Sequence, residues 1–196
     1  MPRRIPFVQG GYYHIYNRGA GRQPIFHEQR NCVYLLRLLK KVIHECGVTV
    51  IAYCLLPNHY HWLLRQDGEI RVGKVPTRVF GSYTQAFNRA YERTGTLFKG
   101  PYKAIAVDTD AYLVNLCCYI YLNPVRHGLV DRPDEWPYSN YLEWIEKRPG
   151  KLVDRELVRD YFAAPQDYEE FVATFQEAGS FQEGRAFDGR AAHSGA

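Results

Sequence analysis

The chain has 196 residues, of which 46% are hydrophobic and 15% aromatic, and its formal net charge is +4. This length and hydrophobic content allow one folded domain of ordinary size with a tail. The small positive charge excludes a histone-like polycation but permits a polyanionic partner. No segment approaches the roughly 20 apolar residues of a membrane span, and the N-terminus lacks the apolar run of a signal peptide.

The cysteines indicate the compartment. There are five of them, an odd number, and no C-x-x-C spacing occurs. They lie in apolar runs such as Tyr53-Cys54-Leu55, which is typical of reduced, buried thiols. We therefore expect a cytoplasmic protein that is not attached to a membrane.

The first part of the chain predicts a strand and then a helix. Residues 10–16 alternate between two faces and predict a strand, followed by a glycine-rich turn at 17–21. From 28 to 46 the apolar residues recur at helical spacing, which predicts an amphipathic helix ended by Gly47.

A strand hairpin and a second helix are predicted next. The β-rich run 48–56 is broken at Pro57-Asn58 and resumes over 59–65. Residues 66–76 contain glycines and a proline and predict a loop, and residues 77–94 predict a helix with several basic positions.

The rest of the chain completes an alternating pattern. Residues 96–107 form a third β-rich region, and a third helix is expected from 108 or 109 to about 122, before Asn123-Pro124. Residues 131–175 predict short helices, and from 176 to 196 glycine, alanine and serine predict a loose tail. The order β-α-β-β-α-β-α predicts an α+β fold, an antiparallel sheet covered by helices.

Two histidines stand one residue apart in the predicted hairpin. His59 and His61 flank Tyr60, and residues i and i+2 of a strand point to the same face. Two imidazoles side by side on a strand form a ready pair of metal ligands. The spacing alone is equally compatible with two half-buried surface histidines.

A tyrosine and an asparagine share one side of the third predicted helix. Tyr119 and Asn123 are four residues apart and lie next to an apolar stripe, whereas Tyr121 points elsewhere. A phenol beside a carboxamide is therefore presented near a helix end. An ordinary half-buried tyrosine with Asn123 as a helix-end residue fits the same pattern.

Basic and aromatic side chains are interleaved over residues 78–103. Such mixtures suit single-stranded nucleic acid, where cations contact phosphates and rings stack on bases. A solvated helix face with core aromatics is the competing interpretation. The residues concerned are Arg78, Tyr83, Phe87, Arg89, Tyr91, Arg93, Phe98, Lys99, Tyr102 and Lys103.

Two segments resemble those of a known family, the single-tyrosine HUH transposases. Residues 55–64, with the His-Tyr-His triplet, resemble the His-hydrophobic-His segment, and residues 119–130 resemble the catalytic-tyrosine segment of the REP-associated branch. Further matches that keep the family's order and spacing are Tyr16-Asn17-Arg18-Gly19, Ser82-Tyr83-Thr84, Asn88-Arg89 and Leu97-Phe98-Lys99-Gly100. Together they cover roughly residues 10–140.

The resemblance implies a ferredoxin-like fold and a transposase-type nuclease that cuts and rejoins single-stranded DNA near hairpins. It implies that His59, His61 and Asn123 hold a divalent metal and that Tyr119 is the nucleophile, which forms a 5′-phosphotyrosine intermediate. Imidazole with amide oxygen suits Mg²⁺ or Mn²⁺. The candidate DNA contacts are Arg18, Arg78, Tyr83, Arg89, Arg93, Lys99 and Lys103.

The expected domains combine this resemblance with the helical pattern and the composition of the C-terminal part. Residues 1–130 form the nuclease domain, residues 131–175 a helical C-terminal extension, and residues 176–196 a tail. Two positions depart from the family pattern: Tyr60 is bulkier than the usual aliphatic residue, and Pro101 replaces an expected arginine.

The alternative functions are a nucleic-acid-binding protein without catalysis and a metallonuclease in which water attacks. The enzyme is expected to be a monomer or a homodimer.

Overall fold

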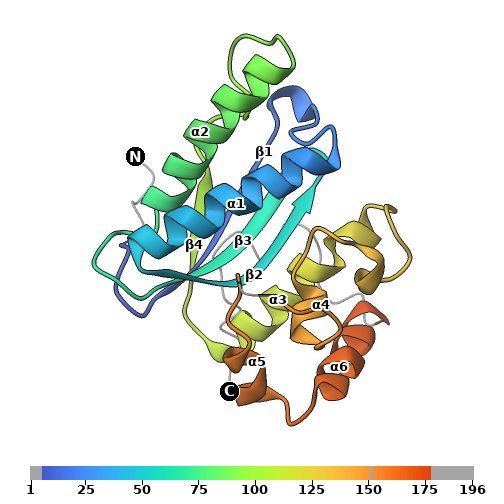
Figure 1. The fold of residues 1–196 in the computed structure, drawn as a ribbon. Coiled ribbons are helices and arrows are strands. Elements are labelled where there is room, and N and C mark those ends of the chain that lie inside the picture. Colours follow the sequence, from blue (N-terminus) through green and yellow to red (C-terminus); the bar gives the residue numbers. More distant parts are fainter. Residues whose placement is uncertain (1–5, 151, 178–196) are drawn as a thin grey trace, which may run out of the picture.

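The computed structural model describes residues 6–150 and 152–177. Its centre is a four-stranded antiparallel sheet with the strand order β2-β3-β1-β4 (Figure 1). The strands are β1 (Tyr12–Arg18), β2 (Val48–Leu56), β3 (His59–Gln66) and β4 (Lys103–Val107). This order and the β-α-β-β-α-β succession are those of the ferredoxin-like fold, so the predicted α+β class is confirmed.

Helices cover both faces of the sheet. Helices α1 (Gln29–Cys46) and α2 (Lys74–Ala90) lie side by side on one face, and α3 (Asp110–Arg126) packs on the other (Figure 1). Because side chains alternate along a strand, β3 divides its residues between two cores. Tyr60, Trp62 and Leu64 pack with α1 and α2, whereas Leu63 packs with α3.

The helical extension packs on the outer side of α3. It contains the 3-10 turn Pro133–Glu135, α4 (Tyr141–Trp144), α5 (Glu156–Tyr161) and α6 (Pro165–Glu177). These helices share one buried cluster with α3. The predicted domain boundary at residue 130 therefore passes through a common core. The division into a nuclease domain and an extension stays a prediction. Of the predicted tail, residues 176–177 belong to α6 and residues 178–196 lie outside the described part.

Two helix boundaries differ from the prediction because proline was judged too disruptive. Helix α2 begins at Lys74, which places Pro76 in the first turn, where a backbone N–H needs no partner in the helix. Helix α3 continues past Asn123 and Pro124 to Arg126. A proline this close to the helix end removes a single backbone hydrogen bond, so the helix continues through Asn123, whose side chain is buried.

Two further expectations were wrong in detail. Asn17 belongs to β1 rather than to a turn, and β4 begins only at Lys103, because residues 97–99 bond to the end of β1 through loop contacts.

All five cysteines are buried and free of disulfides. Among the described residues, no helix is both long and apolar enough to cross a membrane.

Candidate active site

Four side chains from β3 and α3 converge on the face of the sheet that α3 covers. The ring centroids of His59 and His61 are 5.3 Å apart, and that of Tyr119 is 5.5 Å from His61. The Asn123 side chain hydrogen-bonds His59. The strand places the two imidazoles on one face, and the helix places Tyr119 and Asn123 one turn apart, so all four sequence candidates meet at one place.

Hydrogen bonds fix which atoms of this group remain available. His59 Nδ1 donates to Asn58 Oδ1 at 2.7 Å, and Asn123 Nδ2 donates to the Tyr119 carbonyl at 2.8 Å. His61 Nδ1 lies 2.9 Å from His14 Nε2. One polar atom of each side chain is thus held by a partner outside the proposed metal site, and the remaining imidazole Nε2 atoms and the Asn123 amide oxygen, which contacts His59, are the candidate metal ligands.

This set of donor atoms fits a divalent metal. Imidazole nitrogen and amide oxygen are ligands that Mg²⁺, Mn²⁺ or a related ion accepts, and three protein ligands leave positions for phosphate oxygens. Neutral imidazole and an amide oxygen are the forms that bind a metal, and each of the three side chains is held by a further polar group. Among the described residues, no three His, Cys, Asp or Glu side chains group as a metal site; here the amide of Asn123 would be the third ligand.

Burial keeps the imidazoles neutral at neutral pH. Burial lowers the pKa of His14 to about 3. For His59, burial, followed by the neighbouring His127, lowers the pKa to about 4. The pKa of His61 lies well below 6.5, mainly through burial and then through His14 and His59. Neutral imidazole is the form that binds metal, so these rings keep that form into weakly acidic solution.

Three residues at the site were missed by sequence reasoning. His14 and Tyr16 point from β1 to the same face, and the Tyr16 ring stacks on both His14 (4.9 Å) and His61 (5.8 Å). His127 lies with its ring 4.9 Å from that of His59, and its Nδ1 donates to the Asn123 carbonyl. His14 alternates with buried apolar residues in the first strand, and His127 belongs to the 119–130 segment; these signals were present in the sequence.

The tyrosines differ in access to the site. Tyr119 is 4% exposed and lies beneath the Arg126 guanidinium, whose carbon is 5.3 Å from the ring centroid. Tyr121 faces the extension, with its ring 5.5 Å from those of both Tyr141 and Trp144. Tyr16 stacks on His61, but burial raises its pKa and opposes ionisation. The geometry therefore favours Tyr119 next to the histidines and leaves Tyr16 as a second phenol nearby.

The predicted DNA contacts separate into two groups. Arg18 pairs in register with His59, the Lys99 backbone bonds that of Arg18, and the Lys103 ammonium lies 5.8 Å from the Tyr16 ring centroid. These three exposed cations border the histidines. Arg78 and Arg89 lie on α2, on the other face of the sheet, and Arg93 follows that helix.

The expectation that Tyr83 stacks on DNA bases was wrong. Its ring is 1% exposed, and its hydroxyl donates to the Ile25 carbonyl at 2.5 Å. Phe87 is buried in the same core. The pattern of aromatics on α2 therefore reflects packing between α1 and α2, which was the competing interpretation. Tyr60 behaves as the resemblance requires, because it points into this core, 4.3 Å from Phe80.

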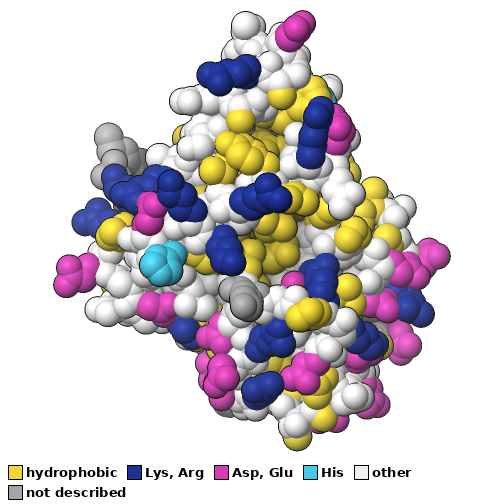
Figure 2. All heavy atoms as spheres, viewed as in Figure 1, with side chains coloured by type: hydrophobic (Ala, Val, Ile, Leu, Met, Phe, Trp, Pro, Cys, Tyr) yellow, Lys and Arg dark blue, Asp and Glu magenta, His cyan; other side chains and the backbone are white. Residues whose placement is uncertain are grey.

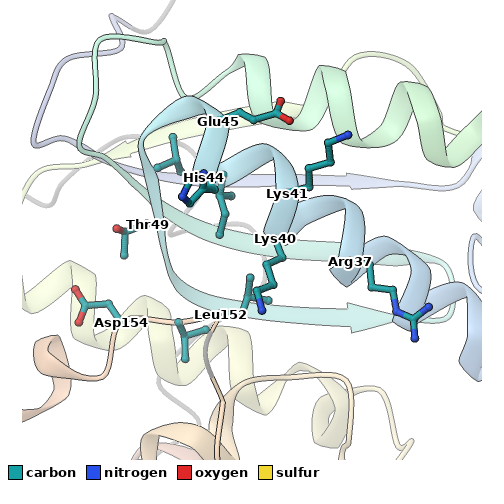
Figure 3. A pocket seen from close by; sticks show the side chains of 11 residues that line it. Arg37, Lys40, Lys41, His44, Glu45, Thr49, Leu152 and Asp154 are labelled. Carbon is teal, nitrogen blue, oxygen red and sulfur yellow. The ribbon is translucent and has the colours of Figure 1, made fainter.

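A hollow of about 790 Å³ lies elsewhere on the surface, between the end of α1, the start of β2 and residues 152–154 (Figure 3). Arg37, Lys40 and Lys41 of α1 are among the residues that line it. Figure 2 shows basic side chains around exposed hydrophobic ones in the middle of this face. The hollow lies at the opposite end of β2 from His59, so it is not part of the candidate site.

The chain is similar to known transposases. The model of the family described as IS200-like transposases matches residues 7–123, which include all four candidate residues. A Haemophilus influenzae relative, named as a REP-associated tyrosine transposase, is 31% identical over 113 residues. That match covers 52% of this chain and 64% of the relative, so it spans less than two thirds of the relative's length.

A solved structure has the same fold. It is that of a REP-associated tyrosine transposase bound to a REP hairpin, with a TM-score of 0.61 and 19% identity. The superposition covers 79% of this chain and 94% of that one. At this identity the similarity concerns the arrangement of strands and helices.

Proposed function

Because the chain belongs to the IS200-like transposase family, we propose that it is a metal-dependent nuclease and strand transferase for single-stranded DNA beside hairpins. Tyr119 is the nucleophile, and His59, His61 and Asn123 hold one Mg²⁺ or Mn²⁺ ion. The proposal gives a role to each of the four residues that β3 and α3 bring together.

The observation that carries the proposal is the position of the Tyr119 ring. It lies edge-on to His61 at 5.5 Å, and its backbone carbonyl accepts a hydrogen bond from Asn123. A nucleophile that attacks a phosphate bound at the two histidines must start from such a place. Tyr121, two residues away, faces the extension instead, with its ring 5.5 Å from those of Tyr141 and Trp144.

In the cleavage step the Tyr119 hydroxyl oxygen attacks the scissile phosphorus and loses its proton. The bond from phosphorus to the 3′ oxygen breaks and that oxygen takes up one proton through solvent, which leaves a 5′-phosphotyrosine ester and a free 3′ hydroxyl. Because the phosphotyrosine ester conserves the energy of the broken phosphodiester bond, the attack of another 3′ hydroxyl rejoins the DNA without a nucleotide cofactor as energy source.

The protein's own groups position the reactants. His59 and His61 lie with ring centroids 5.3 Å apart and Asn123 contacts His59; two imidazole nitrogens and the amide oxygen would hold the metal. When bound, the metal polarises the phosphate and stabilises the departing oxygen. The Arg126 guanidinium, 5.3 Å from the Tyr119 ring centroid, adds positive charge beside the nucleophile.

The substrate is single-stranded DNA flanking a hairpin. The solved structure with the same fold is described as bound to a REP hairpin, and the family resemblance implies the same class of substrate here. Arg18, Lys99 and Lys103 are exposed beside the histidines, where the phosphates of a bound strand would pass. We place the DNA on this side of the sheet rather than on α2.

The test uses a labelled hairpin oligonucleotide with single-stranded flanks, taken from DNA around the protein's own gene. Incubation with Mn²⁺ should give a covalent protein–DNA adduct on a denaturing gel. Tyr119→Phe should abolish the adduct while DNA binding remains. Tyr121→Phe and Tyr16→Phe are the matched controls and should still form it.

The alternative functions give different gels. A binding protein without catalysis would retard the DNA on a native gel, and on the denaturing gel the DNA would be uncut and without an adduct. A metallonuclease that uses water would cut the DNA in Mn²⁺ without an adduct, and Tyr119→Phe would leave that cutting intact. Either pattern rules out Tyr119 as the nucleophile.

A further inference from the structure

His14 is a buried histidine that neither the sequence patterns nor the family comparison assigns. It is 0% exposed, and its Nε2 lies 2.9 Å from His61 Nδ1. The two rings are nearly parallel, with an interplanar angle of 16°. The contact joins β1 directly to one of the proposed metal ligands.

The sheet itself creates this contact. Strands β1 and β3 pair antiparallel, so that Tyr16 lies opposite His61 and His14 lies opposite Leu63. His14 and His61 are therefore diagonal neighbours on one face of the sheet, within reach for long side chains. Tyr16 stacks on both rings and the edge of Tyr119 closes the cluster, with its centroid 6.5 Å from that of His14.

A bond between two neutral imidazole nitrogens contains one hydrogen, and its position decides what His61 can do. If His61 Nδ1 donates to His14, His61 Nε2 keeps a lone pair and can bind a metal. If His14 donates instead, the hydrogen of His61 moves to Nε2 and that atom cannot be a ligand. Outer partners of metal-binding histidines commonly fix the tautomer in this way.

We propose that His14 is a positioning residue that accepts the hydrogen of His61 Nδ1 and so holds His61 Nε2 ready for the metal. The inference rests on the proposed function, since it presumes that His61 is a ligand. His14 touches neither metal nor DNA in this account, and it acts only through His61.

A purely structural role makes different demands on residue 14. A core position on this face needs only a side chain that fills the volume between β1, β3 and α3, and an apolar residue meets that need. A positioning residue needs a hydrogen-bond acceptor at the place of Nε2. Glutamine supplies one, because its side-chain oxygen lies as many bonds from Cα as histidine Nε2, whereas leucine supplies none.

The first experiment measures Mn²⁺ binding to the purified full chain by calorimetry, together with unfolding in urea. His14→Leu should weaken binding about 10- to 100-fold, and His14→Gln should stay within a few-fold of the unaltered protein. Ile15→Ala, on the opposite face of β1, is the matched control: it should lower stability without changing metal affinity.

Two results would overturn the proposal. One is His14→Leu with unchanged Mn²⁺ affinity. The other is His14→Gln as weak as His14→Leu, because loss of fit rather than of the acceptor would then be the cause.

A second measurement uses the unaltered protein and therefore applies even if the His14 variants fail to fold. Nitrogen NMR of histidine-labelled, unaltered protein reports which ring nitrogen carries the hydrogen. We expect His61 with its hydrogen on Nδ1 and none on Nε2 before any metal is added. The opposite tautomer refutes the role of His14. If the unaltered protein binds no Mn²⁺, the metal site of the proposed function fails, and the tautomer still decides independently whether His14 orients His61.

Discussion

The two faces of β3 show opposite uses of one strand. Tyr60 and Trp62 point toward α1 and α2, and their rings stack on Phe80 at 4.3 and 4.8 Å. His59 and His61 point toward α3 and are joined to polar partners. Because side chains alternate along a strand, the same eight residues, His59–Gln66, supply a packed core on one face and a set of donor atoms on the other.

The difference teaches where stability and function are located. Burying aromatic rings on the α1–α2 face is favourable in itself. Burying imidazoles on the α3 face favours their neutral form and therefore makes stability depend on pH. Substitutions on the two faces should accordingly fail in different ways, and four measurements separate them.

The largest expected effect is on the core face. Trp62→Ala removes a 0% exposed ring and should lower the free energy of unfolding by about 3–5 kcal/mol, as measured in urea. Trp62→Phe should cost clearly less, because most of the stacking remains. Near-equal stability of Trp62→Ala and the unaltered protein would mean that this face is not the main core.

On the face toward α3, a substitution should affect metal binding more than stability. His61→Ala should weaken Mn²⁺ binding by more than about 100-fold, which exceeds the effect of removing a residue that only hydrogen-bonds a metal ligand. Its loss of unfolding free energy should be smaller than that of Trp62→Ala. Calorimetry with His44→Ala as the control, an exposed histidine on α1, should give unchanged binding. Equal binding by His61→Ala and the control removes His61 as a ligand.

The pH dependence of stability is the third effect. In the folded protein the pKa values of His14 and His59 fall from 6.5 to about 3 and about 4, so below pH 6.5 the unfolded chain takes up protons first. Unfolding free energy should thus be flat above pH 7 and fall toward pH 4, by about 1.4 kcal/mol per pH unit for each proton. His59→Asn should show a shallower fall; an unchanged slope would contradict the burial of His59.

The smallest effect concerns the cations that border the site. Lys103→Ala should weaken hairpin DNA binding modestly at low salt and reduce its salt dependence by about one phosphate contact. Lys40→Ala, which removes the same charge at the hollow beside α1, is the matched control and should change little. If Lys40→Ala weakens binding and Lys103→Ala does not, the DNA lies on the α1 surface instead.

The sequence predicted features that depend on near neighbours. The pairing of His59 with His61 follows from a spacing of two on a strand, and that of Tyr119 with Asn123 from a spacing of four on a helix. It could not predict the His14 contact, because that depends on the register between two strands 47 residues apart. Tyr83 was misjudged since periodicity alone cannot tell which side of a mixed helix is buried.

The most direct test of the account is to locate the covalent bond. After the Mn²⁺ reaction with hairpin DNA, nuclease and trypsin digestion should leave a short 5′-linked nucleotide on the peptide 104–126, which contains Tyr112, Tyr119 and Tyr121. Fragmentation in the mass spectrometer should place the phosphate on Tyr119. A phosphate on Tyr16 or Tyr121, or complete cleavage of the DNA with no modified peptide, would contradict the account.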